Sequence, residues 1–419
     1  MQSLFSNIPA ESQKILLDFD TIVQGVRPLS SKQMQLLPKD IRDLSHLLTD
    51  EREDRRFGYM NQTTALTAYV RYYQWWNLVR LTRLFAGIGA ENFNIPANGL
   101  CLDIGSGPLT VPIALWLACP SLRNKKLRWY CMDTSQSALS LGEEIFLAVA
   151  ARTAQAAGEV VEPWEIVRIK GEMGTAMHNA VDFISCANVF NEMVQSSGKP
   201  PEYSAKKALE TFSSYSKGKG TFLIIEPGTP PSVRFLSALR SALLKKDWNP
   251  ISPCPHSEEC PMAGKRGGKW CHFAFSAEEG VPPKLKKLSV LAGLPKDRAS
   301  LSFILAKKGF SNVDAETNAY LERKMQVRIA SDVIRLPKGR KGYYGCSKQG
   351  LVLVVSRKED FSLASGDLID VKIPAYVVKD EKSGATIIDL DPKAEPKDKF
   401  KRKPNGRRTG DRKYERSKN

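Results

Sequence analysis

Apolar residues recur every three or four positions along the first quarter of the chain. The spacing is clear at residues 12–19 and 41–48, and it continues through a longer stretch from about residue 63 to residue 85. This period places apolar side chains on one face of a helix, as in amphipathic helices that cover a core. Residues 1–98 are therefore predicted to form an N-terminal helical region.

The longest of these stretches also interleaves basic and aromatic residues, namely Arg71, Tyr72, Tyr73, Trp75, Trp76, Arg80 and Arg83. Such a mixture suits RNA, because it can contact phosphates and stack on bases at the same time. An ordinary amphipathic helix with its aromatic residues in the core would show the same pattern. Both interpretations stay open at this point.

From residue 99 the pattern changes to short apolar runs that alternate with helical segments. The runs, predicted to be strands, lie at residues 100–104, 127–133, 164–169, 181–186 and 221–225. Helical segments are predicted between them at residues 110–117, 135–157 and 203–215, and a further helix at 232–246. This order predicts an α/β fold with a doubly wound sheet, in which parallel strands are covered by helices on both faces. We assign residues 99–250 to this domain.

Three further regions are predicted after this domain. Residues 251–310 hold a cysteine-rich insertion and the last strands of the sheet. Residues 311–391 contain apolar runs at 350–356 and 367–373 and are predicted to form a small β module. Two or three strands do not suffice to identify it as an oligonucleotide-binding barrel. Residues 392–419 are rich in Lys, Arg, Pro and Gly, which predicts a disordered basic tail.

The composition narrows the class of protein. The chain of 419 residues has a net charge of +17, and residues 393–419 alone hold twelve Lys or Arg and four Asp or Glu. This basic excess favours a polyanionic partner. A stretch of about 18 uncharged apolar residues is missing, so no membrane association is expected, and the first residues lack the order of a secretory signal. Eight cysteines spread along a long chain fit a reducing compartment, so we expect a cytoplasmic protein.

The first predicted strand ends in Asp103-Ile-Gly105-Ser106-Gly107, and a predicted helix follows directly. The two glycines permit positive φ and a close approach of a ligand, so the turn can present backbone amides to a nucleotide-like cofactor. Asp133 ends the second strand 26 residues after Gly107, where it could accept hydrogen bonds from ribose hydroxyls. The third glycine of the dinucleotide fingerprint is absent. A tight turn without a ligand is the alternative.

Residues 99–245 resemble the class I S-adenosylmethionine-dependent methyltransferases. The resemblance rests on this glycine turn, on Asp133, and on Asn188-Val-Phe-Asn191-Glu after the fourth strand. A dinucleotide dehydrogenase is less favoured. Amino-methyltransferases of this class usually carry Asn/Asp-Pro-Pro-aromatic where this chain has Asn188-Val-Phe-Asn191, so the methyl acceptor and the catalytic residues stay unassigned. The resemblance implies S-adenosylmethionine as cofactor, bound by Asp103, Gly105, Ser106, Gly107, Asp133 and Asn188.

Three cysteines, Cys254, Cys260 and Cys271, lie in the Gly- and Pro-rich insertion. Buried cysteines usually behave as small apolar residues, but these are flanked by Pro, Glu, Lys and His, which favours metal ligation by an irregular loop. Their spacing differs from the paired CxxC knuckles of structural zinc sites. Proline directly after Cys254 and Cys260 is typical of iron–sulfur sites, and zinc stays the alternative.

A fourth ligand is needed for a four-cysteine site. Cys346 lies in a predicted glycine-flanked turn and is the first candidate, with His256 or His272 as possible substitutes. The remaining cysteines fall in predicted strands or a helix and are predicted to be core residues, namely Cys101, Cys119, Cys131 and Cys186.

Together with Glu226-Pro-Gly-Thr-Pro and the predicted strand at 301–305, the cysteine stretch resembles the methyltransferase-like small-ribosomal-subunit family, found in mitochondria and in bacteria. The resemblance covers about residues 55–357. It implies a four-iron–four-sulfur (4Fe-4S) cluster held by Cys254, Cys260, Cys271 and Cys346.

The same resemblance implies binding to small-subunit ribosomal RNA and ribosomal proteins, and a role in ribosome biogenesis as an assembly factor. We expect a monomer when the protein is free, and a cofactor site at the strand ends opposite the cluster. The alternative function is an active S-adenosylmethionine-dependent rRNA methyltransferase.

Overall fold

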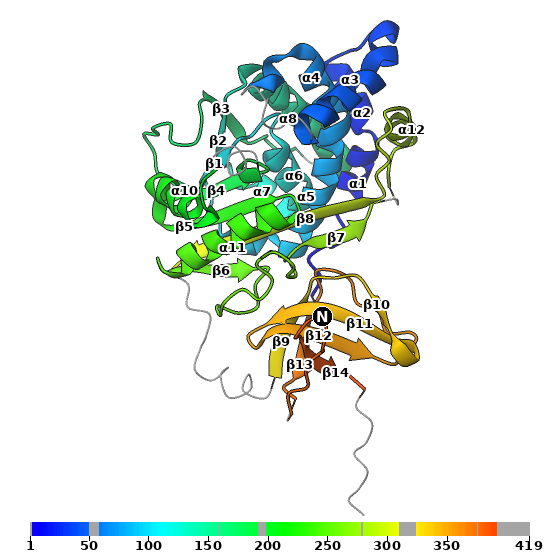
Figure 1. Ribbon diagram of the computed structural model, residues 1–419. Helices are drawn as coiled ribbons and strands as arrows, with labels where there is room; N and C mark the ends of the chain where they lie inside the picture. The colour runs from blue at the N-terminus through cyan, green and yellow to red at the C-terminus, as the bar shows by residue number, and fades with distance from the viewer. Residues whose placement is uncertain are drawn as a thin grey trace, which may run out of the picture.

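Two β-sheets organise the protein, one with eight strands and one with six. In Figure 1 the larger sheet and its helices form the upper body, and the smaller sheet lies below it. The tail predicted for residues 392–419 lies outside the described residues. The computed structural model describes residues 2–49, 58–158, 160–191, 198–277, 280–309, 324–374 and 376–391.

The larger sheet has the strand order β3-β2-β1-β4-β5-β8-β6, with β7 paired to β8. Strands β1 to β5 pair in parallel, and β8 runs antiparallel to β5, β6 and β7. This order, with one reversed strand near the edge, agrees with the predicted class I methyltransferase fold. The strands are β1 Leu100–Ile104, β2 Arg128–Asp133, β3 Glu165–Lys170, β4 Val181–Ala187, β5 Ser216–Glu226, β6 Trp248–Ser252, β7 Phe273–Ser276 and β8 Arg298–Lys308.

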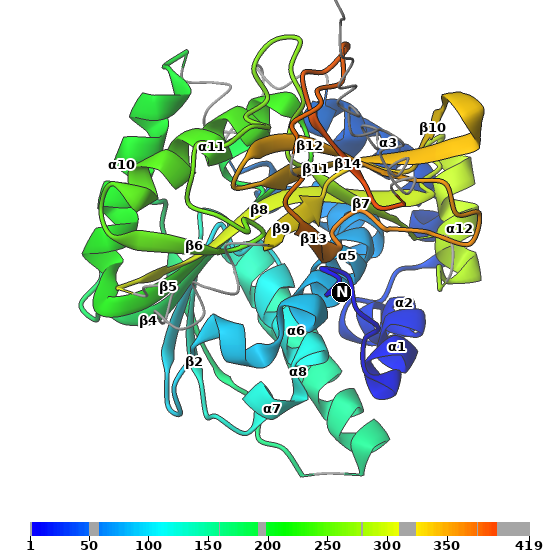
Figure 2. The ribbon, with the colours of Figure 1, turned by 90° about the horizontal axis from the view of Figure 1, so that it is seen from below.

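Helices cover both faces of this sheet, as Figures 1 and 2 show. One face packs against α5 (Gln74–Ile88), α6 (Thr110–Ala118) and α8 (Gln136–Ala157), and the other against α10 (Pro201–Tyr215) and α11 (Pro230–Leu244). Each face has its own apolar core, because strands buried on both sides must be covered twice. The prediction of a doubly wound α/β sheet is confirmed.

The N-terminal region is helical, as predicted from the period of its apolar residues. Its last segment continues without a break from α4 through a π-helical turn, η2, into α5. The other helices of this region are α1 Ala10–Leu17, α2 Phe19–Val26, α3 Ser31–Thr49, η1 Tyr59–Asn61, α4 Thr63–Ala68, η2 Tyr69–Tyr73 and η3 Ala90–Phe93. Short helices elsewhere are α7 Pro120–Arg123, α12 Pro283–Leu291 and η4 Pro337–Gly339.

The interleaved basic and aromatic residues of η2 and α5 belong largely to the interior. Arg71 is buried and donates hydrogen bonds to the side chains of Asp20 and Gln24. Tyr72, Trp75 and Trp76 are buried in the apolar core, so their aromatic faces are not open to bases. Of the two interpretations of this stretch, the ordinary core helix is therefore the correct one.

The smaller sheet has the order β13-β9-β11-β12-β14, with β10 paired to β11. Cys346 lies within β11 and not in a turn, so the turn expected from its flanking glycines is wrong. Gly345 instead allows a close strand contact, because a Cβ there would lie 2.6 Å from Cγ1 of Val327. The strands are β9 Lys324–Ile329, β10 Ile334–Leu336, β11 Arg340–Ser347, β12 Gly350–Ser356, β13 Leu368–Lys372 and β14 Thr386–Asp389.

The chain's N-terminal segment connects the two sheets. Gln2 forms a β-bridge with Leu368 of β13, and the amide of Leu4 donates to the carbonyl of Gly366. The segment then enters the helical region, so the smaller sheet is tied to the larger body from both directions along the chain. Within the described ranges, no helix has the length and apolar character needed to cross a membrane.

Candidate functional site

The glycine turn follows β1 directly and lies against the end of β2. Gly105 and Gly107 have φ values of +68° and +51°, which glycine adopts readily. The amides of Gly105 and Ser106 both donate to the carbonyl of Met132 in β2. The turn is therefore held by the sheet, and its position does not depend on a ligand.

Asp103 is buried beside this turn and carries an unusual carboxyl group. Its Oδ1 accepts a hydrogen bond of 2.6 Å from Oγ of Ser185, whereas its Oδ2 has no partner among the described residues. Burial raises the pKa of Asp103 to about 7. A buried carboxylate oxygen without a partner is costly, and a cationic group on a ligand would satisfy it.

Asp133 lies at the end of β2 and faces the same turn. Its Oδ2 accepts from the amide of Gly107 at 2.9 Å, and its Oδ1 accepts from the amide of Ser135 at 2.8 Å. A carboxylate oxygen has two lone pairs, so each oxygen can still accept from a ligand hydroxyl. The structure thus brings together the predicted residues Asp103, Gly107 and Asp133.

The side chain of Val189 lies close to this turn. A Cβ at position 105 would lie 2.3 Å from Cγ2 of Val189, so glycine is required there even without a ligand. At position 107 the nearest atom to an added Cβ is Sδ of Met60, at 3.7 Å. Gly105 alone is therefore weaker evidence for a cofactor than its place in the motif suggested.

Asn188, the last predicted cofactor residue, follows β4 with a φ of +60°. Its amide donates to the carbonyl of Ile225 at 2.8 Å, and its Oδ1 accepts from Nη2 of Arg80 at 3.3 Å. Asn188 is thus held at the carboxyl edge of the sheet, on the side of β4 next to β5.

No role in this site was predicted for Glu226, and Arg80 was considered only as part of the basic and aromatic stretch. Glu226 ends β5 and is fully buried, and its carboxylate accepts from the amides of Phe190 and Asn191 at 2.8 and 2.9 Å. Arg80 also donates to the carbonyl of Ser300. Glu226 fixes the turn after β4, and the acidic residue at the end of a predicted strand was the signal that could have identified it.

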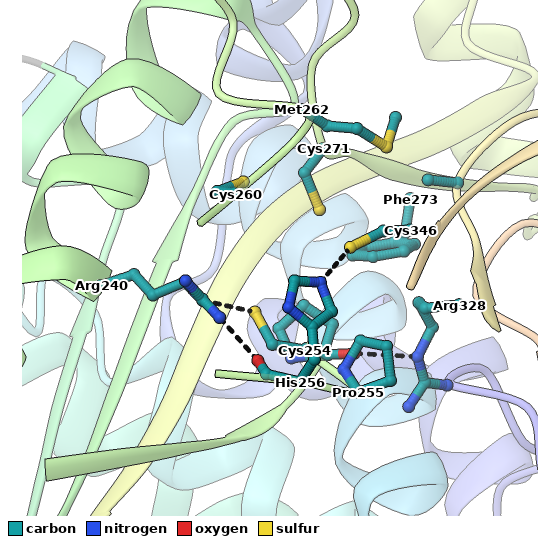
Figure 3. A pocket seen from close by; sticks show the side chains of 12 residues that line it. Arg240, Cys254, Pro255, His256, Cys260, Met262, Cys271, Phe273, Arg328 and Cys346 are labelled. Carbon is teal, nitrogen blue, oxygen red and sulfur yellow. Dashed lines mark hydrogen bonds between the residues drawn. The ribbon is translucent and has the colours of Figure 1, made fainter. Parts of the chain in front are cut away.

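The four predicted metal-ligating cysteines line one small cavity, shown in Figure 3. Three come from the insertion between β6 and β7, whereas Cys346 comes from β11 of the smaller sheet. Cys254, Cys260 and Cys271 are partly buried and Cys346 is buried. The cavity therefore lies where the insertion meets the smaller sheet. The other four cysteines are buried in the larger body, as predicted.

Two buried arginines, neither of them predicted from the sequence, lie on opposite sides of this cavity (Figure 3). Arg240 of α11 directs Nε to Sγ of Cys254 at 3.2 Å and donates to the carbonyls of His256 and Glu258. Arg328 of β9 donates to the carbonyl of Pro253 at 3.0 Å. Their positive charges would offset the negative charge of thiolates bound to a metal or cluster.

His256 also lines the cavity, and its Nε2 lies 2.9 Å from Sγ of Cys346. Burial, with a contribution from Arg240, lowers the pKa of His256 to about 4. His272 is absent from the cavity lining and stacks on Trp270 instead, with ring centroids 5.0 Å apart. Of the two substitute ligands considered, His256 alone is positioned for that role.

The thiols of this cavity would ligate a metal in their deprotonated form. Burial raises the pKa of Cys254, Cys271 and Cys346, and a bound metal would reverse this by deprotonating them. Within the described part of the chain, no group of three or more His, Cys, Asp or Glu side chains is arranged to hold a single metal ion. Metal binding is therefore not shown.

We expected the cysteine cavity to lie at the strand ends opposite the glycine turn. This expectation is wrong. Strand β6 runs in the same direction as β5, because both are antiparallel to β8, and the insertion leaves from the end of β6. Trp270 of the insertion donates to the carbonyl of Gly228, just after β5. Both candidate sites therefore lie at the carboxyl edge of the larger sheet.

Comparison with known proteins adds a family assignment. Residues 63–343 match the model of a family described as mitochondrial small ribosomal subunit Rsm22. A comparison with curated proteins found no match.

Several of the similar solved structures are methyltransferases, all at low identity. A 16S rRNA methyltransferase, KamB, is 10% identical, covers 52% of this chain and 91% of its own, and has a TM-score of 0.31. Precorrin-6y C5,15-methyltransferase of Geobacter metallireducens is 12% identical over 54% and 88%, also with a TM-score of 0.31. An O-methyltransferase of Thermotoga maritima is 12% identical over 54% and 64%, with a TM-score of 0.29. The fold assignment above depends on strand order and not on these matches.

Proposed function

This chain belongs to the Rsm22 family, and we propose that it binds the RNA of the small ribosomal subunit and assists subunit assembly. The family match over residues 63–343 carries this proposal. It includes the glycine turn and the three cysteines of the insertion, and it ends just before Cys346. The net charge of +17 agrees with a polyanionic partner.

We further propose that the cysteine cavity holds a 4Fe-4S cluster. The support is a set of four thiols from two parts of the fold, with Arg240 and Arg328 beside them. We favour a cluster over zinc because the cysteine spacing differs from the paired CxxC knuckles of structural zinc sites. Proline also follows Cys254 and Cys260 directly, as in iron–sulfur sites. When bound, the cluster would cross-link the insertion to the smaller sheet.

S-adenosylmethionine is the cofactor we propose for the glycine turn. The unpartnered Oδ2 of Asp103 could accept from its amino group, and Asp133 could accept from its ribose hydroxyls. The cationic amino group would then stabilise the charged form of Asp103, which burial disfavours in the ligand-free protein.

Replacing Asp133 with Ala is expected to weaken S-adenosylmethionine binding by about 10- to 150-fold, which corresponds to roughly 1.5–3 kcal/mol for a charge-assisted hydrogen bond. The carboxylate also accepts from Gly107, so the turn loses one of its supports in the same variant. Isothermal titration calorimetry would measure the change. Asp133→Asn keeps one acceptor oxygen and should lose less affinity. Equal affinities of the unmodified protein and of Asp133→Ala would contradict this assignment.

An active rRNA methyltransferase is the second candidate function. Its support is Asn191, whose Oδ1 is buried and has no partner among the described residues, close to the turn that follows β4. Such an oxygen could accept from an amino group of a nucleobase. Transfer of a labelled methyl group to immature small-subunit RNA would favour the enzyme, and cofactor binding without transfer would favour the assembly factor.

The proposed function is tested by binding of the full chain to immature small subunits. We expect sedimentation with these particles, and no comparable binding to mature large subunits. Protein that stays free of small-subunit particles would contradict the proposal. The monomeric free state and the cytoplasmic location stay predictions.

A further inference from the structure

Two cationic side chains lie close together at the carboxyl edge of the larger sheet, near the turn that follows β4. Arg80 belongs to α5, and Lys296 lies in the loop between α12 and β8. Arg80 donates to the carbonyl of Ser300 in β8 at 3.0 Å. Nζ of Lys296 lies 5.9 Å from the ring centroid of Trp76, which precedes Arg80 by one turn of α5. These two residues, the Arg80–Lys296 pair, are therefore neighbours although they are distant in the sequence.

Aromatic rings hold the ammonium group of Lys296 in place. Its Nζ lies 5.6 Å from the ring centroid of Tyr72 and 5.0 Å from that of Tyr73, in addition to its contact with Trp76. Such cation–π contacts position an ammonium group without neutralising its charge. In the part of the chain that the structure describes, no carboxylate forms an ion pair with Lys296, and the residue stays exposed. The charge of Lys296 is thus fixed in position and uncompensated by contact.

The guanidinium group of Arg80 donates only to uncharged acceptors. Besides the carbonyl of Ser300, these are the side-chain oxygens of Asn77 and Asn188, at 2.9 and 3.3 Å from Nη2. The carboxylate of Glu226 attracts this charge, but its oxygens accept from two backbone amides. Neutral groups therefore hold Arg80 in place, and its charge is compensated only from a distance.

The two positive charges also act on each other. Burial of its ammonium group and the charge of Arg80 lower the pKa of Lys296 to about 8. Burial likewise lowers the pKa of Arg80. Like charges that are held together without a contacting carboxylate cost free energy, and an anion bound to both would remove this cost. The Arg80–Lys296 pair is therefore a candidate anion site.

The pair lies beside the proposed cofactor site. Asn188, which accepts from Arg80, is followed by Val189, whose Cγ2 would lie 2.3 Å from a Cβ at Gly105 of the glycine turn. An anion at the Arg80–Lys296 pair would thus lie close to this turn. A chain that carries phosphates, bound here through one of them, would place a nucleotide at the turn after β4.

We propose that Arg80 and Lys296 bind one phosphate of an RNA backbone beside the glycine turn. Arginine directs several N–H donors at phosphate oxygens, and lysine adds a point charge. The proposal rests on the proposed function, because it takes the RNA of the small subunit as the ligand. A carboxylate of a partner protein is less favoured, since the net charge of +17 favours a polyanion.

Replacing Lys296 with Gln tests this site at its exposed residue, because Arg80 also holds Asn188 and its loss could disturb the turn after β4. We expect the affinity for protein-free RNA of immature small subunits to fall by about 10-fold or more, as for the loss of a hydrogen bond to a charged group. The slope of log affinity against log salt should become shallower by up to about 0.9, the value for one phosphate contact. Filter binding of the full chain at several salt concentrations would measure both changes.

Two further variants separate the site from a general effect of charge. Lys296→Arg keeps a cation that can stack on the same rings, so it should keep most of the affinity. Lys287→Gln, at an exposed position of α12, removes the same charge elsewhere and should leave the affinity nearly unchanged. Equal losses in Lys296→Gln and Lys287→Gln would overturn the site, because the net charge alone would then explain them.

Acetylation of lysine amines in the unmodified chain, read by mass spectrometry of its peptides, tests the contact without a substitution. We expect the same RNA to protect Lys296 more strongly than Lys287, and more strongly than inorganic phosphate does at an equal concentration of phosphate groups. Equal protection by inorganic phosphate would indicate a site for the free anion and overturn the inference. Protection by small-subunit particles but not by their protein-free RNA would show that a ribosomal protein covers Lys296, which also overturns it.

The failures of the two proposals are distinguishable. If the chain binds small-subunit particles but Lys296→Gln binds their RNA as tightly as the unmodified chain does, the phosphate site is wrong and the proposed function stands. If the unmodified chain does not bind these particles, the proposed function fails, and this inference fails with it.

Discussion

Serine in place of Cys346 is expected to remove the iron of the proposed cluster, lower the melting temperature and weaken RNA binding in one step. The loss of one thiolate leaves a cluster with an unligated iron, and metal loss belongs to the mechanisms behind the largest single-residue destabilisations. We expect a cost of about 3 kcal/mol or more, which lowers the melting temperature of a domain of 150–250 residues by roughly 6–12 °C.

The size of this effect follows from the position of Cys346 in the fold. It is the proposed ligand that β11 contributes, whereas the other three proposed ligands come from the insertion. Without the cluster, the insertion would contact the smaller sheet through weaker links, such as the hydrogen bond from Arg328 to Pro253. Lys269 of the insertion would then lose its fixed place over Tyr344, and RNA affinity should fall with it.

Cys119→Ser is the matched control for this experiment. Cys119 is also buried, but its sulfur faces the carbonyl of Phe85 in the larger body, where a hydroxyl can replace it. The iron content and visible spectrum of the Cys119→Ser variant should equal those of the unmodified chain. If Cys346→Ser keeps its full iron content, Cys346 is not a ligand and His256, 2.9 Å away, becomes the candidate.

Asparagine in place of Asp103 is expected to stabilise the ligand-free protein above pH 7 and to abolish S-adenosylmethionine binding. Burial raises the pKa of Asp103 from 3.8 to about 7. This difference in pKa changes the free energy of unfolding by about 4 kcal/mol, at about 1.36 kcal/mol per pKa unit. Asparagine keeps an oxygen for the hydrogen bond from Ser185 and carries no charge to bury.

The pH window follows from the direction of this shift. Between pH 4 and pH 7 the folded protein holds a proton on Asp103 that the unfolded chain releases, so the free energy of unfolding falls as pH rises through this range. Below pH 4 both states are protonated and the contribution is fully retained, and above pH 7 it is lost. Asp103→Asn removes the contribution of this residue to the pH dependence of the free energy of unfolding.

Thermal unfolding of both proteins from pH 4.5 to pH 8.5, without cofactor, would measure this difference. The variant should gain stability relative to the unmodified chain as pH rises, by up to about 4 kcal/mol. Asp370→Asn, at an exposed position of β13, changes the net charge equally and should show no such trend. A pH dependence shared by Asp103→Asn and the unmodified chain would show that Asp103 does not cause it.

Much of the fold could be predicted from local sequence patterns. The strand and helix periods located β1 to β5 and the helices between them, because a sheet buried on both faces needs continuous apolar runs. The smaller sheet was harder to predict, since its topology depends on pairings between distant strands that no local pattern encodes. Cys346 is an example, because its flanking glycines predicted a turn at a position where β11 continues.

The residues of the candidate sites could also be predicted only in part. Asp103, Gly107 and Asp133 belong to one short motif and the strand beside it, and the structure brings them together. Arg240 and Arg328 lie in a helix and a strand whose own sequence gives no sign of the cysteines they face. Tertiary packing alone places them there, and the same packing puts both sites on one edge of the sheet.

The metal content of the full chain, purified without oxygen, tests the central claim most directly. The proposal predicts about four iron and four acid-labile sulfide per chain, with a broad absorbance near 400 nm from thiolate-bound iron. A colourless protein that contains about one zinc per chain, or no metal, would contradict it.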